Sequence, residues 1–233
     1  MDHPEANEFW GKEDNVTVCK ILQAKGHSMN HVLGHCCVHG SVKIFSHLME
    51  TTSLNPSYVS YWGSEYNSVA VCVWHSQPEV LKVLLKDPRA CLRIRGLLYG
   101  TVLSDAVGSR SFRVNPHGAH AANTSEPSRQ VEVIRLLLED GRIVPTEEEF
   151  YHCSEIPEIM SLLLADTRLD PTVRNNMPLE QSIRRKSLPL VRVLLADERV
   201  SKLVDQRTLD LARQWGTEEI VSLVSSVLSD KEN

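Results

Sequence analysis

Histidine and cysteine side chains gather between residues 27 and 39, where their chemistry suits a metal ion. Histidines recur at every fourth position, and two cysteines stand between the last two: His27, His31, His35, Cys36, Cys37 and His39. Residues four apart share one face of a helix, and neutral imidazole with thiolate suits zinc. A small zinc-binding module built from His31, His35, Cys36 and His39 is therefore one alternative.

Three features of this cluster argue against a metal centre. A step of four residues drifts about 40° around a helix, so His31 and His39 diverge. Cys36 and Cys37 are adjacent, which splays their side chains. No glutamate follows His31 or His35 to act as the base of a zinc protease. We therefore expect no metal site and no cofactor.

Catalysis by a nucleophile is not indicated either. A Cys/His hydrolase needs a nucleophile, a base and an orienting group that converge. The sequence repeat described below predicts a linear stack of helix pairs, which offers no closed cleft for these three groups. The sequence also carries no Gly-rich phosphate loop and no carboxylate pair that stands out from a solvated surface. We expect a protein that is not an enzyme and has no catalytic residues.

The elements that carry these residues form a repeat, which is clearest in residues 177–197. There, two short segments with apolar residues at helical spacing flank a polar turn. Shifting the sequence by 30 residues places Leu179 on Leu209 and Leu190 on Ile220, so one offset matches both segments. A period near 30 residues with two helices per unit is typical of a helical repeat solenoid.

These units resemble the ankyrin repeat. Met177-Pro178-Leu179-Glu180 and Thr208-Leu209-Asp210-Leu211-Ala212 stand where that family opens its first helix with Thr-Pro-Leu-His-x-Ala. Residues 131–140, 159–166 and 190–197 stand where it carries an apolar Val/Ile-Val-x-Leu-Leu-Leu run. No unit keeps the full opening motif, so we expect a less regular stack held mainly by apolar burial. The resemblance implies an all-α, ankyrin-like helical repeat solenoid.

We expect a single repeat domain over residues 1–233. Its approximate units are 5–26, 29–52, 67–90, 97–141, 145–168, 176–199 and 206–229. A stretch rich in Gly, Ser, Asn and Pro at 108–128 predicts a loop insertion in the fourth unit. Residues 53–66 are predicted to form a loop because of their Pro, Gly and Ser content.

Single residues mark the expected ends of the helices. Gly40 stands in a turn where a positive φ is needed. Pro157 and Pro189 stand in the first turn of a second helix, where a missing N–H costs nothing. Four units end in the same acidic–basic pattern: Asp87/Arg89, Asp140/Arg142, Asp166/Arg168 and Asp197/Arg199. The arginine either offsets the unfavourable acidic helix end or pairs with a neighbouring unit, and the sequence leaves both open.

The ankyrin resemblance implies a non-catalytic protein–protein interaction module, which binds through its concave face and inter-repeat loops. Aromatic residues on such loops are typical interface anchors, and basic residues beside aromatic ones hold acidic or aromatic peptides. The candidate partner-binding residues are Tyr58, Tyr61, Trp62 and Tyr66 in the loop, and Trp74, His75, Arg184 and Arg185 on the concave face.

Purely structural roles remain alternatives for some of these residues. Tyr61 and Trp62 would then fold back onto a neighbouring unit as core, and residues 184–186 would be a solvated charged face. A further alternative is a substrate-recruiting adaptor of a larger complex such as a ubiquitin ligase, although no adaptor motif is readable at either end.

Composition narrows the setting. The chain has 233 residues, is 42% hydrophobic and carries a net charge of −5, so no general attraction to nucleic acid is implied. The sequence has no apolar run of about 18 residues, so it does not predict a membrane-spanning helix. Six cysteines without paired spacing, and an N-terminus without signal-peptide features, indicate reduced thiols. We expect a monomer in the cytoplasm, with the nucleus as the alternative, that binds a protein partner still to be identified.

Overall fold

The computed structural model describes residues 14–61, 64–91, 101–108, 126–153 and 155–232. Within these ranges the chain is mostly helical, as the sequence predicts, with one β-hairpin. The chain divides into two compact units. Unit 1 comprises Met1–Ala106 and Ala121–Ile143, and unit 2 comprises Val107–His120 and Val144–Asn233. None of the described helices is both long and apolar enough to cross a membrane.

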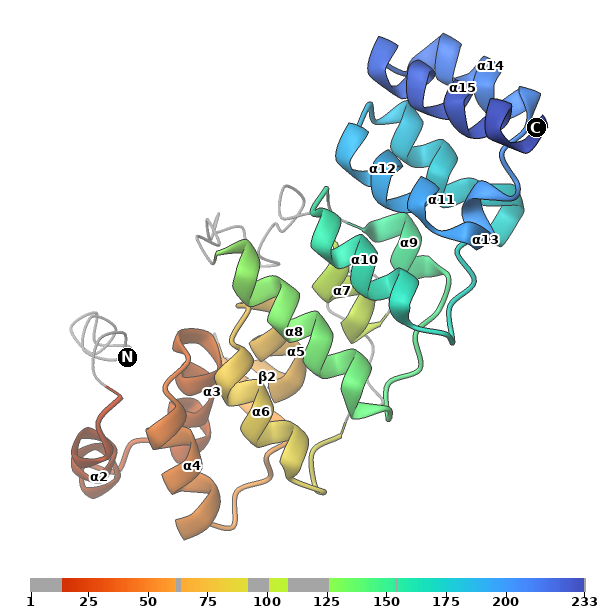
Figure 1. The fold of residues 1–233 in the computed structure, drawn as a ribbon. Coiled ribbons are helices and arrows are strands. Elements are labelled where there is room, and N and C mark those ends of the chain that lie inside the picture. Colours follow the sequence, from red (N-terminus) through yellow and green to blue (C-terminus); the bar gives the residue numbers. More distant parts are fainter. Residues whose placement is uncertain (1–13, 62–63, 92–100, 109–125, 154, 233) are drawn as a thin grey trace. The chain divides into compact units, whose positions relative to one another are not determined.

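Unit 1 is built from helices that pack in pairs. α3 packs on α4 and α5 packs on α6, while α3 also contacts α5, and α6 contacts both α4 and α8 (Figure 1). Large side chains such as Phe45, Leu48 and Leu81 are fully buried between them. The helices are α2 (Val16–Ala24), α3 (Met29–His39), α4 (Val42–Thr51), α5 (Ser68–Trp74), α6 (Pro78–Lys86), α7 (Val102–Val107) and α8 (Pro127–Asp140).

The turns between paired helices in unit 1 are linked by side chains. Gly40 ends α3 with φ +78°, which confirms the predicted positive φ. Beside it, Gln77 Nε2 donates to Val38 O at 2.7 Å. Arg129 then donates to Gln77 Oε1 at 2.6 Å and to Ser76 O at 3.1 Å. The turns after α3 and α5 and the start of α8 are thereby tied into one hydrogen-bonded row.

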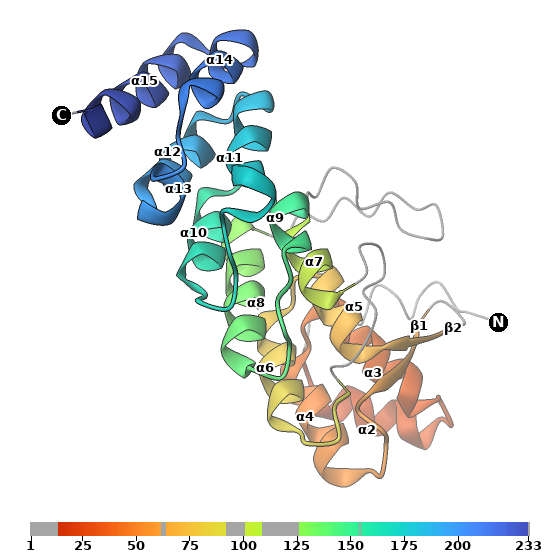
Figure 2. The ribbon, with the colours of Figure 1, turned by 90° about the vertical axis from the view of Figure 1, so that its right-hand side faces the viewer.

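The expectation of an irregular loop over residues 53–66 is wrong for its second half. β1 (Tyr58–Tyr61) and β2 (Ser64–Asn67) pair antiparallel, with Val59 opposite Tyr66. The strands lie beside α3 and α5 (Figure 2). Alternation explains β1, because Val59 is buried while Tyr58 before it is exposed. Aromatic and β-branched residues favour such a pleated surface, whatever the loop residues around them.

Unit 2 continues with paired helices. α11 packs on α12 and α14 on α15; α11 also contacts α9 and α14, and α12 contacts α10 and α15 (Figure 1). Pro157 opens α10 and Pro189 is the second residue of α12, as predicted. The elements are α9 (Glu148–His152), α10 (Pro157–Ala165), α11 (Val173–Arg184), α12 (Leu188–Ala196), α13 (Glu198–Ser201), α14 (Gln206–Trp215) and α15 (Glu218–Glu232).

The repeated Asp-x-Arg pattern forms an ion pair in each copy, and in two copies the arginine also reaches an earlier helix. Each arginine pairs with the aspartate two residues before it, for example Arg199 with Asp197 at 2.7 Å. The same side chain then reaches back one helix pair: Arg199 Nη2 donates to Leu164 O at 2.7 Å, near the end of α10. In unit 1, Arg142 Nη2 donates to Leu85 O at 2.6 Å. The last carbonyls of a helix lack partners within it, and these arginines supply donors.

Two predicted segments fall partly outside the described residues. Of the first unit at 5–26, only the part from residue 14 is described, and it contains α2. Of the insertion at 108–128, residues 109–125 lie outside. Gly108 forms a β-bridge with Cys153, and α8 begins at Pro127. The last two residues assigned to the insertion therefore belong to a helix.

Candidate functional site: an aromatic–basic strip

Two aromatic side chains of unit 2, the exposed Trp215 and the half-buried Tyr151, each lie against an arginine. The Cζ atom of Arg184 is 5.5 Å from the centroid of the Trp215 ring, and that of Arg174 is 5.0 Å from the Tyr151 ring. Guanidinium groups at such distances are attracted to the ring face. We call these four residues and Arg185 the aromatic–basic strip.

The ends of two neighbouring helices bring Arg184 and Trp215 together. Arg184 is the last residue of α11 and Trp215 the last of α14, and these helices pack on each other. Trp215 remains 43% exposed, and Arg184 is exposed as well. Among the described residues, no ion pair engages Arg184. Its N–H donors are therefore available to a ligand.

Arg185 makes different contacts from Arg184. Its two terminal nitrogens donate to the carbonyl oxygens of Tyr151 and Cys153, both at 3.2 Å. These carbonyls lie at the end of α9, so Arg185 ties the end of α11 to that of α9. The adjacent arginines thus divide the work: Arg185 holds the strip together, and Arg184 faces solvent.

A left-handed turn positions the remaining arginine. Arg174, Asn175 and Asn176 have φ values of 51°, 59° and 69°, immediately before the right-handed part of α11. Left-handed backbone costs about 1–2 kcal/mol per residue, less for asparagine. Buried Asn176 anchors the turn, because its Nδ2 donates to Val200 O at 3.0 Å. The turn brings Arg174 over Tyr151, to whose hydroxyl oxygen it donates a hydrogen bond.

The strip is suited to binding rather than to thiol chemistry. Cys153 is the cysteine nearest to it, and burial raises the pKa of its thiol to about 12, a rise that the Arg185 charge only partly opposes. A thiol with that pKa is protonated near neutral pH and is a poor nucleophile. Exposed rings and guanidinium groups instead suit an acidic or aromatic segment of another molecule.

The aromatic residues predicted on the loop at 53–66 have mixed outcomes. Tyr58, in β1, is 49% exposed, so its ring is available for contact. Tyr66, in β2, is half-buried. Trp62 lies outside the described residues, and for Tyr61 only the backbone is described. A binding role for these four residues stays a prediction.

The expected exposure of Trp74 on the concave face is wrong. Its side chain is only 7% exposed, and every other residue of α5 (Ser68–Trp74) is buried as well. α5 packs against α3, α6 and β2, which leaves this short helix with no free face. His75, the residue after it, is half-buried.

The four residues of the alternative zinc module do not come together as a metal site. Cys36 points into the core, and burial raises the pKa of its thiol well above the usual range. His39 stacks on His35 ring to ring, with 5.8 Å between centroids, and burial lowers the pKa of His39. No group of three metal-ligating side chains occurs among the described residues. His31 and His35 do lie together, as described below.

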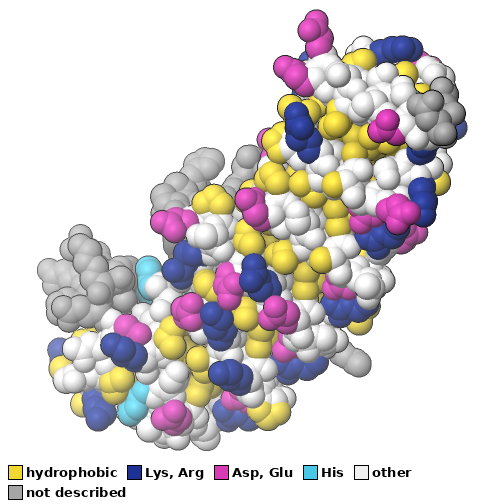
Figure 3. All heavy atoms as spheres, in the orientation of Figure 1, with side chains coloured by type: hydrophobic (Ala, Val, Ile, Leu, Met, Phe, Trp, Pro, Cys, Tyr) yellow, Lys and Arg dark blue, Asp and Glu magenta, His cyan; other side chains and the backbone are white. Residues whose placement is uncertain are grey.

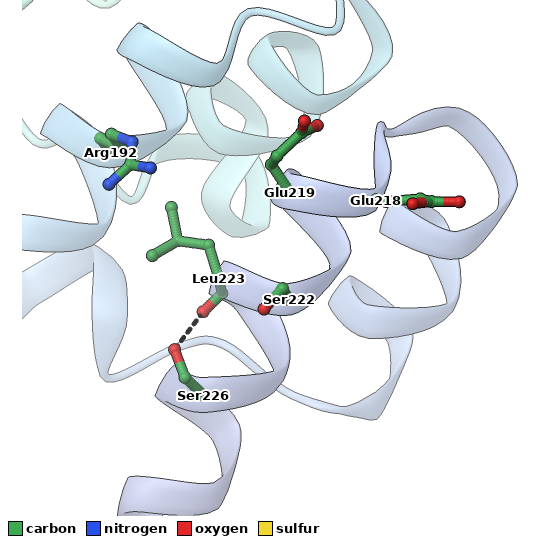
Figure 4. A pocket seen from close by; sticks show the side chains of 6 residues that line it. All are labelled: Arg192, Glu218, Glu219, Ser222, Leu223 and Ser226. Carbon is green, nitrogen blue, oxygen red and sulfur yellow. Dashed lines mark hydrogen bonds between the residues drawn. The ribbon is translucent and has the colours of Figure 1, made fainter.

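A shallow hollow lies between α12 and α15 of unit 2. It is open to solvent, and Glu218 points away from Leu223 and Arg192 (Figure 4). The hydrogen bond in it, from Ser226 Oγ to Leu223 O at 2.8 Å, is internal to α15. No set of polar groups converges on the hollow. Its lining residues are Arg192, Glu218, Glu219, Ser222, Leu223 and Ser226.

Sequence reasoning selected Arg184 and Arg185 but did not select Trp215, Tyr151 or Arg174. The signal for Trp215 was the repeat itself, since Trp215 follows Arg185 by 30 residues, as Leu209 follows Leu179. Equivalent positions in stacked units are neighbours. Nothing in the local sequence signals that Tyr151 and Arg174 meet, because the left-handed turn brings them together.

The sequence was also compared with protein-family models and with curated proteins. No family model matches the chain, and no curated protein matches it.

Proposed function

We propose that this protein is a non-catalytic protein–protein interaction module of the ankyrin-like helical repeat type, and that the aromatic–basic strip binds an acidic segment of its partner. The observation that carries the proposal is the exposed guanidinium of Arg184 on the exposed ring of Trp215.

Arg184 is placed to meet an anion. Its Cζ atom lies over the Trp215 ring, 5.5 Å from the centroid, and the side chain is exposed, so its N–H donors are accessible. A guanidinium group can bind a carboxylate with two parallel hydrogen bonds. Tryptophan and arginine are also the residue types that most often dominate the binding energy of interfaces.

The arrangement of helices supports the repeat part of the proposal. First helices contact first helices, as in α9, α11 and α14, and second helices contact second helices, as in α10, α12 and α15. Together with the 30-residue period, this agrees with stacked two-helix units. The strip lies on the first helices, which line the binding face in the ankyrin family.

A contrasting surface of unit 1 strengthens the choice of the strip. Around α6 and α8, basic and acidic side chains alternate (Figure 3). Lys82 pairs with Glu132 at 3.2 Å and with Glu79 at 3.5 Å, and Arg135 lies 3.8 Å from Glu132. Exposed pairs of this kind neutralise each other and contribute little to binding or stability. The arginines of the strip have no acidic partner within the part of the chain that the structure describes.

Peptide binding tests the proposal. Fluorescence anisotropy with a labelled peptide of alternating glutamate and tyrosine should show saturable binding to the full-length protein. Replacing Arg184 with Glu, which reverses its charge, or Trp215 with Ala, which removes its ring, should each weaken binding about tenfold or more. A peptide with lysine in place of glutamate should not bind.

Arg192→Glu is the matched control. It makes the same charge change on an exposed arginine of the same unit, away from the strip. It should leave the affinity nearly unchanged. Equal losses in Arg184→Glu and Arg192→Glu would reduce the effect to net charge, and an absence of binding by the wild type would remove the proposal.

A further inference from the structure

Two imidazole rings on α3 approach each other through the same atom. Nε2 of His31 lies 3.1 Å from Nε2 of His35, and the ring centroids are 4.8 Å apart with the planes at 70°. The residues are four apart on one helix, so successive turns hold both rings. Both side chains are half-buried, and solvent reaches them.

This contact has two chemical meanings. As a hydrogen bond, it requires one ring to carry its proton on Nε2 and the other on Nδ1. With a metal ion in place of the shared proton, both rings present lone pairs. Metal–nitrogen bonds of about 2.0–2.1 Å to atoms at this separation meet at about 100°, which lies between square and tetrahedral coordination.

His39 lies beside this pair without joining it. Its ring is nearly parallel to that of His35, with 8° between planes, so the two rings meet through their faces and not through their nitrogens. His39 therefore contributes no nitrogen to the contact, and His31 and His35 are the two ligands.

We propose that His31 and His35 form a two-histidine site for a divalent transition-metal ion. Imidazole pairs bind Cu²⁺ most tightly, with Ni²⁺ and Zn²⁺ weaker, in the general order of metal affinities. The remaining coordination positions go to water. The site is in unit 1 and is independent of the aromatic–basic strip, so either proposal stands if the other fails.

Titration of the full-length protein with Cu²⁺ tests this site. We expect one ion to bind with an electron paramagnetic resonance spectrum that shows two nitrogen ligands. His31→Ala and His35→Ala should each weaken Cu²⁺ binding about tenfold or more. In the wild type, an ion bound to one imidazole meets the other at high effective concentration, and each variant loses that second ligand. Each single variant should also lose one nitrogen from the spectrum.

His39→Ala is the control, since it removes an imidazole four residues from His35 but no ligand. It should keep two nitrogen ligands. Far-ultraviolet circular dichroism of the metal-free variants shows whether they fold. If a His35 variant is unfolded, His31→Gln tests the same pair by removing the other ligand. Wild-type affinity in both His31→Ala and His31→Gln would overturn the proposal, as would loss of the two-nitrogen spectrum in His39→Ala alone.

Discussion

At the scale of single residues, the arginines of the Asp-x-Arg pattern differ in a way that can be measured. Arg199 and Arg89 both pair with an aspartate two residues before them. Of these two, only Arg199 also donates to Leu164 O near the end of α10 and, more weakly, to Leu169 O in the segment that follows α10. The sequence left open whether the arginine serves its own unit or its neighbour, and Arg199 serves both.

We therefore predict that Arg199→Ala lowers the free energy of unfolding by about 1–2 kcal/mol, since it leaves helix-end carbonyls without their donor. Arg89→Ala, which removes an exposed ion pair, should cost about 0.5 kcal/mol or less. Urea unfolding followed by circular dichroism measures both. Equal losses would mean that the reach to the preceding helix adds nothing.

The same pattern predicts a dependence on pH. The hydrogen bond from Arg199 lowers the pKa of Asp197 below its usual value. The ionised aspartate is therefore favoured in the folded state, so its stabilisation is complete above the unfolded pKa of about 3.9 and disappears as the pH falls through the lower folded pKa. The deficit of Asp197→Asn in unfolding free energy should shrink as the pH drops below about 4. A deficit that stays constant down to acid unfolding would contradict this assignment.

At the scale of elements, two glycines at helix ends make a matched pair. Gly26 and Gly40 both have φ +78°. A Cβ added to Gly26 meets nothing within 4 Å, whereas one added to Gly40 lies 2.4 Å from Gln77 Oε1. Gly40 therefore serves both the turn and the row of hydrogen bonds through Gln77.

Both Gly→Ala changes should cost about 1 kcal/mol for left-handed backbone. We predict that Gly40→Ala costs about 1 kcal/mol more than Gly26→Ala, because displacing Gln77 breaks its bond to Val38 O. Thermal unfolding measures the difference. In a Gln77→Ala background the extra cost of Gly40→Ala should vanish, and its persistence there would assign the cost to another contact.

Elements were predictable where a local rule decides them. Gly40 and the prolines 157 and 189 obey backbone sterics that act whatever the surroundings. The hairpin was missed because turn-forming residues around it outweighed the short alternation at Tyr58 and Val59. The burial of Trp74 could not be predicted. Aligning the sequence units identifies equivalent residues, but it does not show which elements pack against α5. The Trp215–Arg184 contact likewise depends on two helices that are distant in sequence.

At the scale of the whole molecule, the repeat architecture that we propose predicts that stability is local. In stacked units each pair of helices contacts only its neighbours, so the effect of a mutation decays along the chain. Val224 is fully buried in α15, at the C-terminal end of the described chain. It offers a place to perturb one end alone.

We predict that Val224→Ala speeds amide hydrogen exchange in α14 and α15 and, to a smaller extent, in α11 and α12. Exchange in α3 to α6 should not change. Mass spectrometry of exchanged peptides measures this directly, with wild type as reference. A uniform increase over all helices would indicate one cooperative unit and would argue against the repeat description.

The reach of the arginines to an earlier helix pair also bears on how the protein is made. Arg199 lies 35 residues after Leu164, and Arg142 lies 57 residues after Leu85. During synthesis a helix such as α10 leaves the ribosome before its completing arginine has been added to the chain. The ends of α6 and α10 therefore acquire these hydrogen bonds only after later sequence has been synthesised. Lys231, which donates to Lys202 O and Val204 O, provides the same closure near the end of the chain.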